Sequence, residues 1–233
     1  MSNVKVSKSG QKSKGPVSPS ATLVLDNNKT FKGVAFGAEK TVVGEVCFNT
    51  SMTGYQEIIS DPSYAGQIIN FTFPHIGNVG TNLKDNETLI PHAKGIIINC
   101  DISNPSNYRS IKHFDEWLKK NDIPAICNVD TREITNSIRD FGAPKGSLST
   151  NPKAKITELK KINRDWSGLD GLDLAKQVTC AEPYKFNKNT KAKYKIVAVD
   201  YGIKLNILNS LSALNAEIIV VPATTNADDI IKL

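Results

Sequence analysis

Short hydroxyl and amide side chains are concentrated in residues 48–57, FNTSMTGYQE, and again in residues 60–64, SDPSY. Such side chains around a glycine can line a pocket for a small polar molecule, because each offers hydrogen-bonding atoms on a short stem. The same composition also occurs in complex loops whose side chains satisfy their own backbone. The residues alone leave both interpretations open and favour the loop.

A second polar cluster, PHIGNVGTN, occupies residues 74–82. Its glycines, Gly77 and Gly80, could let backbone N–H groups approach a phosphate, but the spacing matches neither the P-loop nor the dinucleotide fingerprint. A turn is the plainer interpretation. His75 has the chemistry of a general base, although a structural histidine is the stronger expectation here.

The four cysteines, Cys47, Cys100, Cys127 and Cys180, are widely separated. They form no C-x-x-C pair and have no clustered histidines, so they do not predict a zinc site. A nucleophilic cysteine needs a nearby base and a sharp, exposed turn, and none of the four has that setting. We therefore expect them to be small buried hydrophobic residues.

Strands must position most of these polar segments. Residues 21–37 predict a hairpin, in which an apolar strand, 21–25, turns at Asp26-Asn27-Asn28 and returns through Phe31, Val34 and Phe36. Further apolar runs bounded by Gly, Asn and Pro predict strands at residues 45–48, 67–73, 95–100 and 125–129. The first domain is therefore expected to be β-rich.

Two amphipathic helices are predicted within this domain by apolar spacings of three and four residues. Over residues 110–121 the apolar face consists of Ile111, Phe114, Trp117 and Leu118, and over residues 131–141 it consists of Ile134, Ile138 and Phe141. Asp130 and Glu133 have the spacing of a helix cap, and Gly142 is a stop signal. Residues 151–177 are expected to be mostly helical, with a break at residues 167–168.

A change of composition marks a second domain. Residues 182–195 carry five lysines and show no apolar periodicity, so we expect a linker at residues 182–194. After it, a strand at 196–199, a helix at 204–214, a strand at 217–221 and a helix capped by Asn226 predict the start of a doubly wound α/β domain. The expected domains are thus residues 21–181 and 195–233.

A parallel sheet needs cover on both faces, and two strands with one full helix do not provide it. We therefore expect the second domain to be incomplete within these 233 residues, as a truncated piece of a longer protein. An unusual small sheet is the alternative.

Composition narrows the possible functions. Four of the six excess positive charges, Lys5, Lys8, Lys12 and Lys14, lie in residues 1–20, a Ser/Gly/Pro/Lys-rich tail that we expect to be disordered. The remainder has no basic stripe interleaved with aromatic residues, which disfavours nucleic-acid binding. No apolar run reaches 18 residues, and no secretory leader is apparent, so we expect a cytoplasmic protein that does not bind membranes.

Taken together, several long motifs resemble the glutamine-hydrolysing small subunit of carbamoyl phosphate synthetase. The resemblance extends over residues 21–233 and rests on these motifs: GEVCFNTSMTGYQEIISDPSYAGQ (44–67), PHIGNVGTN (74–82), VDTREIT (129–135), GLDLAKQV (171–178) and VDYGIKLNIL (199–208). It implies a mixed α/β fold, with a small-subunit N-terminal domain followed by the first β-α-β of a flavodoxin-like class I amidotransferase domain.

The resemblance also implies an activity and partners. In such subunits a cysteine thiolate attacks the glutamine amide, a histidine transfers protons, and a glutamate orients the histidine. The large subunit then joins the released ammonia to bicarbonate with ATP and Mg²⁺, making carbamoyl phosphate for arginine and pyrimidines. The implied partners are that large subunit and glutamine, with no cofactor in this chain itself.

One site residue transfers onto this sequence. Ser63, in the DPSY segment, matches a family position that contributes to the glutamine site. No residue of the chain matches the family's catalytic Cys, His or Glu, so we expect the isolated chain to be inactive. A non-catalytic docking module for the large subunit is the alternative function, and a separate large subunit is preferred to a fused one.

Overall fold

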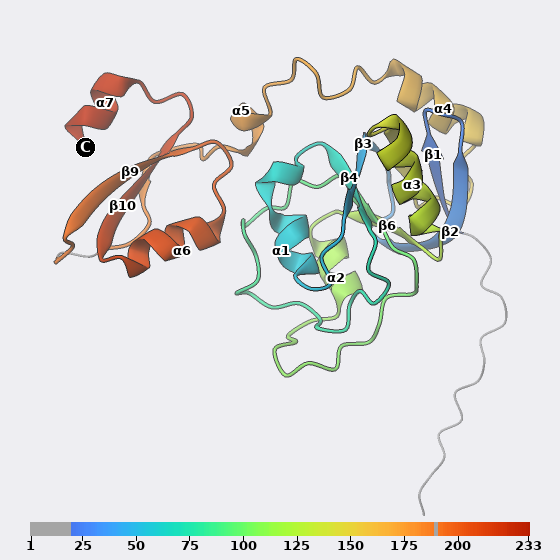
Figure 1. Cartoon of the computed structure of the whole chain (residues 1–233), viewed down its shortest axis with the longest axis horizontal. Coiled ribbons are helices and arrows are strands. Elements are labelled where there is room, and N and C mark those ends of the chain that lie inside the picture. The colour runs from blue at the N-terminus through green and yellow to red at the C-terminus, as the bar shows by residue number, and fades with distance from the viewer. Residues whose placement is uncertain (1–19, 189–190) are drawn as a thin grey trace, which may run out of the picture.

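The computed structural model describes residues 20–188 and 191–233. The tail expected to be disordered, residues 1–20, lies outside the described residues except for Ser20. Two parts are visible in Figure 1, a β-barrel with helices around it and a small sheet with its own helices. The expected mixed α/β class, β-rich at its N-terminal side, is confirmed.

Seven strands form the barrel, in the order β1-β2-β6-β5-β4-β3-β7. It closes because β1 pairs with β7 as well as with β2, its partner in the predicted hairpin. Closure leaves no exposed edge strand in this part of the chain. The strands are β1 (Ala21–Leu25), β2 (Thr30–Gly37), β3 (Thr41–Asn49), β4 (Gln67–Phe71), β5 (Gly95–Ile97), β6 (Pro124–Cys127) and β7 (Lys145–Ser149).

The barrel core takes buried apolar side chains from every strand, as the alternation of inward and outward residues requires. These side chains belong to one packed cluster and are Leu23, Phe31, Val46, Ile68, Ile97, Ile126 and Leu148. The core is narrow, because a Cβ atom on Gly146 would lie 2.5 Å from Cγ2 of Val46. The barrel is thus a packed scaffold and not a channel.

Two helices, α1 (Tyr55–Ser60) and α2 (Phe114–Lys120), cover the outer surface of the barrel. The rings of Tyr55 and Phe114 pack with centroids 4.8 Å apart, in a cluster that also holds Phe71 and Trp117. Figure 1 shows the two helices together on the side of the barrel nearer the small sheet. This packing fixes α1, the helix that leads directly to Ser63.

The helix α3 (Thr131–Phe141) has the predicted ends. The side chain of Asp130 accepts the Glu133 N–H at 2.8 Å, and Gly142 adopts φ = 88°. Two expected core residues are corrected: Ile111 is 64% and Phe141 83% exposed. Ile111 precedes α2, which is capped by His113 and begins only at Phe114, and Phe141 is the final residue of α3.

Residues 151–177 are less helical than expected. They hold α4 (Ile156–Asp165) and the start of α5 (Leu174–Val178), and the predicted break at residues 167–168 lies between the two helices. The polar network that fixes α4 is buried: Asn163 donates to the Val24 carbonyl at 2.8 Å and contacts the Ser147 hydroxyl. This polar contact ties α4 to β1 and β7.

The small sheet has the order β8-β10-β9 and is formed by β8 (Tyr184–Lys185), β9 (Tyr194–Asp200) and β10 (Ala216–Pro222). As expected, β9 and β10 are parallel and are connected by a helix, α6 (Leu205–Ala213). Leu208 of α6 packs against one face of the sheet. A last helix, α7 (Ala227–Lys232), is capped by Asn226, as predicted.

The strand β8 was not predicted. It lies inside residues 182–194, the expected linker, and pairs antiparallel with β10 through Tyr184 and Val220. The two residues of β8, Tyr184 and Lys185, therefore belong to the small sheet and not to a linker. The sheet is mixed, because β8 is antiparallel to β10 whereas β9 is parallel to it. A two-residue strand is too short to show an apolar periodicity, so no pattern in the residues indicated it.

Candidate functional site at the contact between barrel and small sheet

The segment around Ser63 is a helical turn that follows α1. Gly54 adopts φ = 80° before α1, and a short 3-10 helix, η1 (Pro62–Tyr64), follows it. Asp61 caps η1 by accepting the Ser63 N–H at 2.9 Å. Ser63 itself is exposed. We call residues 61–64 the Ser63 turn.

A second turn, residues 201–204, lies beyond the carboxyl end of β9. Asp200, only 6% exposed, accepts the N–H groups of Gly202 at 2.9 Å and Ile203 at 2.8 Å through one carboxylate oxygen. Its other oxygen accepts the Cys180 N–H at 2.7 Å. Asp200 therefore holds residues 201–204, which we call the β9 turn, in one conformation. It also ties this turn to Cys180, which lies just after α5.

The two turns touch. A Cβ atom on Gly202 would lie 3.1 Å from Cβ of Pro62 and 2.8 Å from Cγ2 of Val178, so no side chain fits there. Gly202 also adopts φ = 93°, a region that favours glycine. The Lys204 ammonium lies 3.3 Å from the Asp61 carboxylate and pairs with it. Asp61 thus caps the Ser63 turn and also forms an ion pair with the β9 turn.

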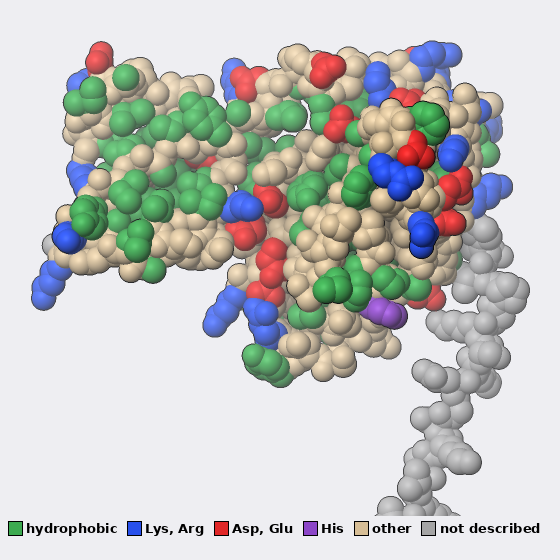
Figure 2. All heavy atoms as spheres, in the orientation of Figure 1, with side chains coloured by type: hydrophobic (Ala, Val, Ile, Leu, Met, Phe, Trp, Pro, Cys, Tyr) green, Lys and Arg blue, Asp and Glu red, His purple; other side chains and the backbone are tan. Residues whose placement is uncertain are grey.

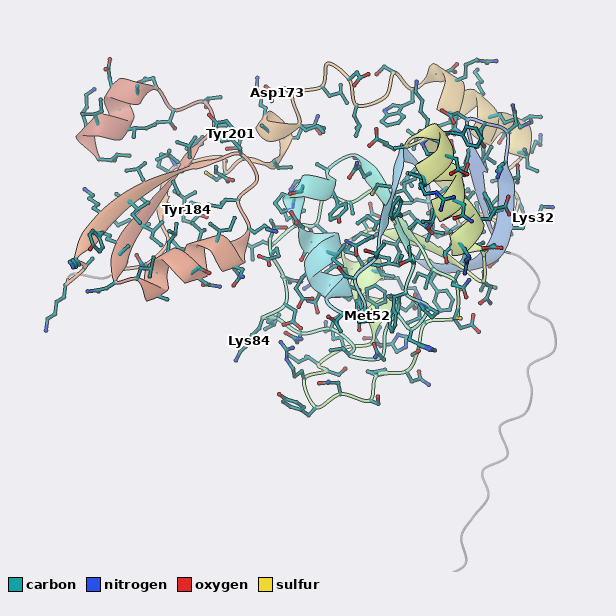
Figure 3. All side chains as sticks on the ribbon, in the orientation of Figure 1. Lys32, Met52, Lys84, Asp173, Tyr184 and Tyr201 are labelled. Atoms are coloured by element: carbon teal, nitrogen blue, oxygen red, sulfur yellow. The ribbon has the colours of Figure 1, made fainter. Side chains whose placement is uncertain are left out.

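The location of this contact has chemical significance. In open α/β sheets, ligands bind outside the carboxyl ends of the parallel strands, and the β9 turn follows the carboxyl end of β9. Figure 3 shows Tyr201 at the end of the small sheet nearer α5. The barrel thus places the Ser63 turn beside the carboxyl end of β9.

Two polar residues of α1, Gln56 and Ser60, have structural roles. Gln56 is buried and both accepts the Asn82 N–H at 3.0 Å and donates to the Asn82 carbonyl at 2.6 Å. Ser60 is fully buried and donates to the Gln56 carbonyl at 2.7 Å. Gln56 and Ser60 thus stabilise α1 and its attachment to Asn82, which agrees with the structural interpretation for this part of the segment.

Residues 74–82 form a turn. Gly80 donates to the Gly77 carbonyl at 2.9 Å, and a Cβ atom on Gly80 would lie 2.1 Å from the Ser110 hydroxyl. The glycines therefore allow chain segments to pack closely, which favours the turn over a phosphate cradle. His75 is exposed and packs edge-on against Phe73, with ring centroids 5.7 Å apart.

Three of the four cysteines, Cys47, Cys127 and Cys180, have environments that disfavour the thiolate. Burial, with a smaller contribution from Glu45, raises the pKa of Cys47 to about 12. Burial, with Asp101 nearby, raises the pKa of Cys127 to about 12, and burial also raises the pKa of Cys180. A nucleophilic cysteine needs the opposite shift. All four cysteines lie in the described part of the chain as free thiols.

Two further absences apply to residues 20–188 and 191–233. Within these ranges no group of three His, Cys, Asp or Glu side chains is placed to hold a metal ion. None of the helices found there has the length and apolar character needed to cross a membrane.

A closed seven-stranded barrel joined to a small mixed sheet, with a serine turn at their contact, defines a two-part α/β protein. The family model of the carbamoyl-phosphate synthase small chain, CPSase domain, matches residues 23–148, more than half of the chain. The chain belongs to this family.

Curated relatives agree with this assignment. The carbamoyl phosphate synthase small chain of Rhizobium meliloti (strain 1021) is 45% identical over 234 residues, covering 92% of this chain and 58% of its own length. That of Bartonella bacilliformis (strain ATCC 35685 / KC583 / Herrer 020/F12,63) is 47% identical over 232 residues, with the same coverage. This chain therefore spans a little over half the length of these relatives.

Among solved structures, an aminopeptidase from Aneurinibacillus sp. strain AM-1 aligns with 91% of this chain and 50% of its own. Its TM-score of 0.36 and 12% identity are too low to support any argument about fold or function.

Asp61, Asp200 and Lys204 were not singled out by the sequence. Each lies within a motif that carried the family resemblance, DPSY or VDYGIKLNIL, so a signal was present. That signal could not show that the two motifs meet, because Asp61 and Lys204 are far apart in the chain and only the fold brings them to 3.3 Å.

Proposed function

We propose that this chain provides the barrel and the first α/β elements of a glutamine-hydrolysing small chain of carbamoyl phosphate synthase, and that Ser63 contacts glutamine. The observation that carries the proposal is the position of the Ser63 turn against the β9 turn, where Asp61 pairs with Lys204 at 3.3 Å. The family assignment supports the proposed reaction, and this contact supports the proposed position of the substrate.

The side chain of Ser63 suits this role. Its backbone N–H is already bonded to Asp61, whereas its hydroxyl has no partner among the described residues. A hydroxyl can donate one hydrogen bond and accept others, so it can contact the amide, carboxylate or ammonium group of glutamine. Because η1 is capped at Asp61 and packed against Gly202, Ser63 is held in place before the ligand arrives.

The hydrolysis of glutamine needs an activated nucleophile in addition to the Ser63 contact. Hydrolysis of an amide through a covalent intermediate needs an activated nucleophile with an adjacent base. Cys47 and Cys127 have a pKa of about 12, and Cys180 a raised pKa, so their thiols remain protonated at neutral pH. We propose that residues 1–233 on their own do not hydrolyse glutamine.

This proposal predicts no ammonia release when purified residues 1–233 are incubated with glutamine. A coupled glutamate dehydrogenase assay would detect the product, with a complete small chain as the positive control. Release above the no-protein background, abolished by alkylating the cysteines, would overturn the proposal.

The large chain of the synthase is the proposed partner, and it would use the ammonia, bicarbonate, ATP and Mg²⁺ in the cytoplasm. Large apolar side chains exposed on the barrel loops support a docking role; they are Met52 (71%, labelled in Figure 3), Leu83 (80%), Leu89 (96%), Ile90 (72%) and Tyr108 (95%). Exposed apolar side chains on loops are available as anchors for another protein. Docking without catalysis is therefore a second candidate function of these residues.

Co-purification tests the docking role. We expect tagged residues 1–233 to retain the large chain, and Leu89→Ser with Tyr108→Ser to weaken retention by about tenfold, because an exposed apolar anchor contributes 1 kcal/mol or more to an interface. Phe141→Ser is a matched control, since Phe141 is also largely exposed, at 83%, but lies on α3. Equal retention of all variants would exclude these loops as the docking surface.

A further inference from the structure

The helix α6 begins without a cap of its own. Its first residue is Leu205, and the preceding residue, Lys204, has no side-chain acceptor and makes no capping bond. The first turn of any helix leaves backbone N–H groups that need partners from elsewhere. The missing acceptors here come from the barrel.

Glu87 supplies these acceptors across the contact between the two parts. Its carbonyl accepts the Leu205 N–H at 2.9 Å, and its carboxylate oxygen Oε2 accepts the Asn206 N–H at 2.9 Å. The two residues of the second bond are 119 positions apart in the chain. A carboxylate at a helix N-terminus also interacts favourably with the helix dipole.

The segment that carries Glu87 is fixed by α1. The Glu87 N–H donates to the Ser60 hydroxyl at 2.9 Å, and the Thr88 hydroxyl donates to the Ser60 carbonyl at 2.8 Å. At the residue before Glu87, Gln56 donates to the Asn86 side chain at 2.7 Å. Ser60 and Gln56 are both buried in α1, so residues 86–88 are held against a fixed part of the barrel domain.

The helix α1 therefore positions two residues that contact the small-sheet part, Asp61 and Glu87. One end of α1 continues into Asp61, which pairs with Lys204, and its side chains hold Glu87, which caps Leu205 and Asn206. These two contacts lie on either side of the point where the β9 turn becomes α6. Figure 2 shows acidic side chains gathered where the small sheet meets the barrel.

We propose that Glu87 is a positioning residue of the glutamine site, which caps α6 from the barrel and thereby sets the β9 turn against the Ser63 turn. This inference rests on the proposed function, because it assumes that glutamine binds beside Ser63. Glu87 does not touch the substrate in this proposal. It acts through the backbone of residues 205 and 206.

Two measurements on a complete small chain, assayed with its large chain, test the proposal in Glu87→Ala. The first measurement is the hydrogen-exchange rate of the backbone amides of residues 203–208, which reports on the cap. We expect this rate to rise about fivefold when the carboxylate is removed. The second measurement is steady-state kinetics, which reports on the position of the β9 turn. We expect the KM for glutamine to rise about fivefold, with kcat little changed. Ammonia-dependent synthesis should not change.

Two variants sharpen the test. Glu87→Gln keeps an acceptor oxygen and should restore most of the exchange protection and of the KM. Glu116→Ala removes an exposed carboxylate from α2 and should change neither quantity. Unchanged exchange in Glu87→Ala would overturn the cap, and faster exchange with an unchanged KM would overturn the positioning role alone. A complete chain that shows no glutamine-dependent synthesis would overturn the proposed function and the inference together.

Discussion

Replacing Gly202 by alanine should lower the free energy of unfolding of the small-sheet part by about 2–5 kcal/mol. Two effects contribute. The residue adopts φ = 93°, which costs an alanine roughly 1–2 kcal/mol. The new methyl group would also lie 2.8 Å from Cγ2 of Val178 and 3.1 Å from Cβ of Pro62, and such overpacking costs about 1–3 kcal/mol. Hydrogen exchange of β9 and β10 in increasing urea measures the loss.

Gly171→Ala is a matched control for this prediction. Gly171 also adopts a positive φ, 78°, but nothing lies within 4 Å of the position of its added Cβ. It should show only the backbone cost, about 1–2 kcal/mol. If the two variants lost equal stability, the close packing of the β9 turn against Val178 and Pro62 would not exist in solution.

Ser63→Ala in a complete small chain should raise the KM for glutamine by roughly 10- to 100-fold. The ligand carries a carboxylate and an ammonium group, and a hydrogen bond to a charged group is worth about 1.5–3 kcal/mol. The substitution should leave stability unchanged, because the Ser63 hydroxyl supports no other described residue. Steady-state kinetics with varied glutamine measures the effect.

Two comparisons make the Ser63 result specific. Ser106→Ala removes another exposed serine hydroxyl of the barrel part and should leave the KM unchanged. Ammonia supplied directly should support the same rate in the Ser63 variant as in the unsubstituted enzyme, since ammonia bypasses glutamine. A glutamine KM within twofold of the unsubstituted value would remove Ser63 from the site.

Local pattern was sufficient for much of the fold. The β1–β2 hairpin follows from an apolar strand, a polar turn and a return strand, and the ends of α3 follow from Asp130 and Gly142. The β9-α6-β10 unit follows from two apolar runs separated by a helical periodicity. In each case the residues that decide the structure lie within a few positions of one another.

Elements that depend on distant partners were missed. The strand β7 has the sequence KGSLS, which is not typical of a strand, yet it closes the barrel by pairing with both β1 and β3. The helix α1 spans only six residues, too few to show a periodicity, and is stabilised by Phe114 and by its bonds to residues 82–88. Tertiary packing decided both.

The candidate site divides in the same way. The sequence by itself determined the family, through several long motifs, and it determined Ser63 as a candidate, through the DPSY segment. Only the tertiary structure decided that Asp61 pairs with Lys204, that Pro62 lies against Gly202, and that Glu87 caps α6. These contacts join segments more than a hundred residues apart, and closing so long a loop is favourable only when the barrel and the small sheet have formed the surfaces that meet.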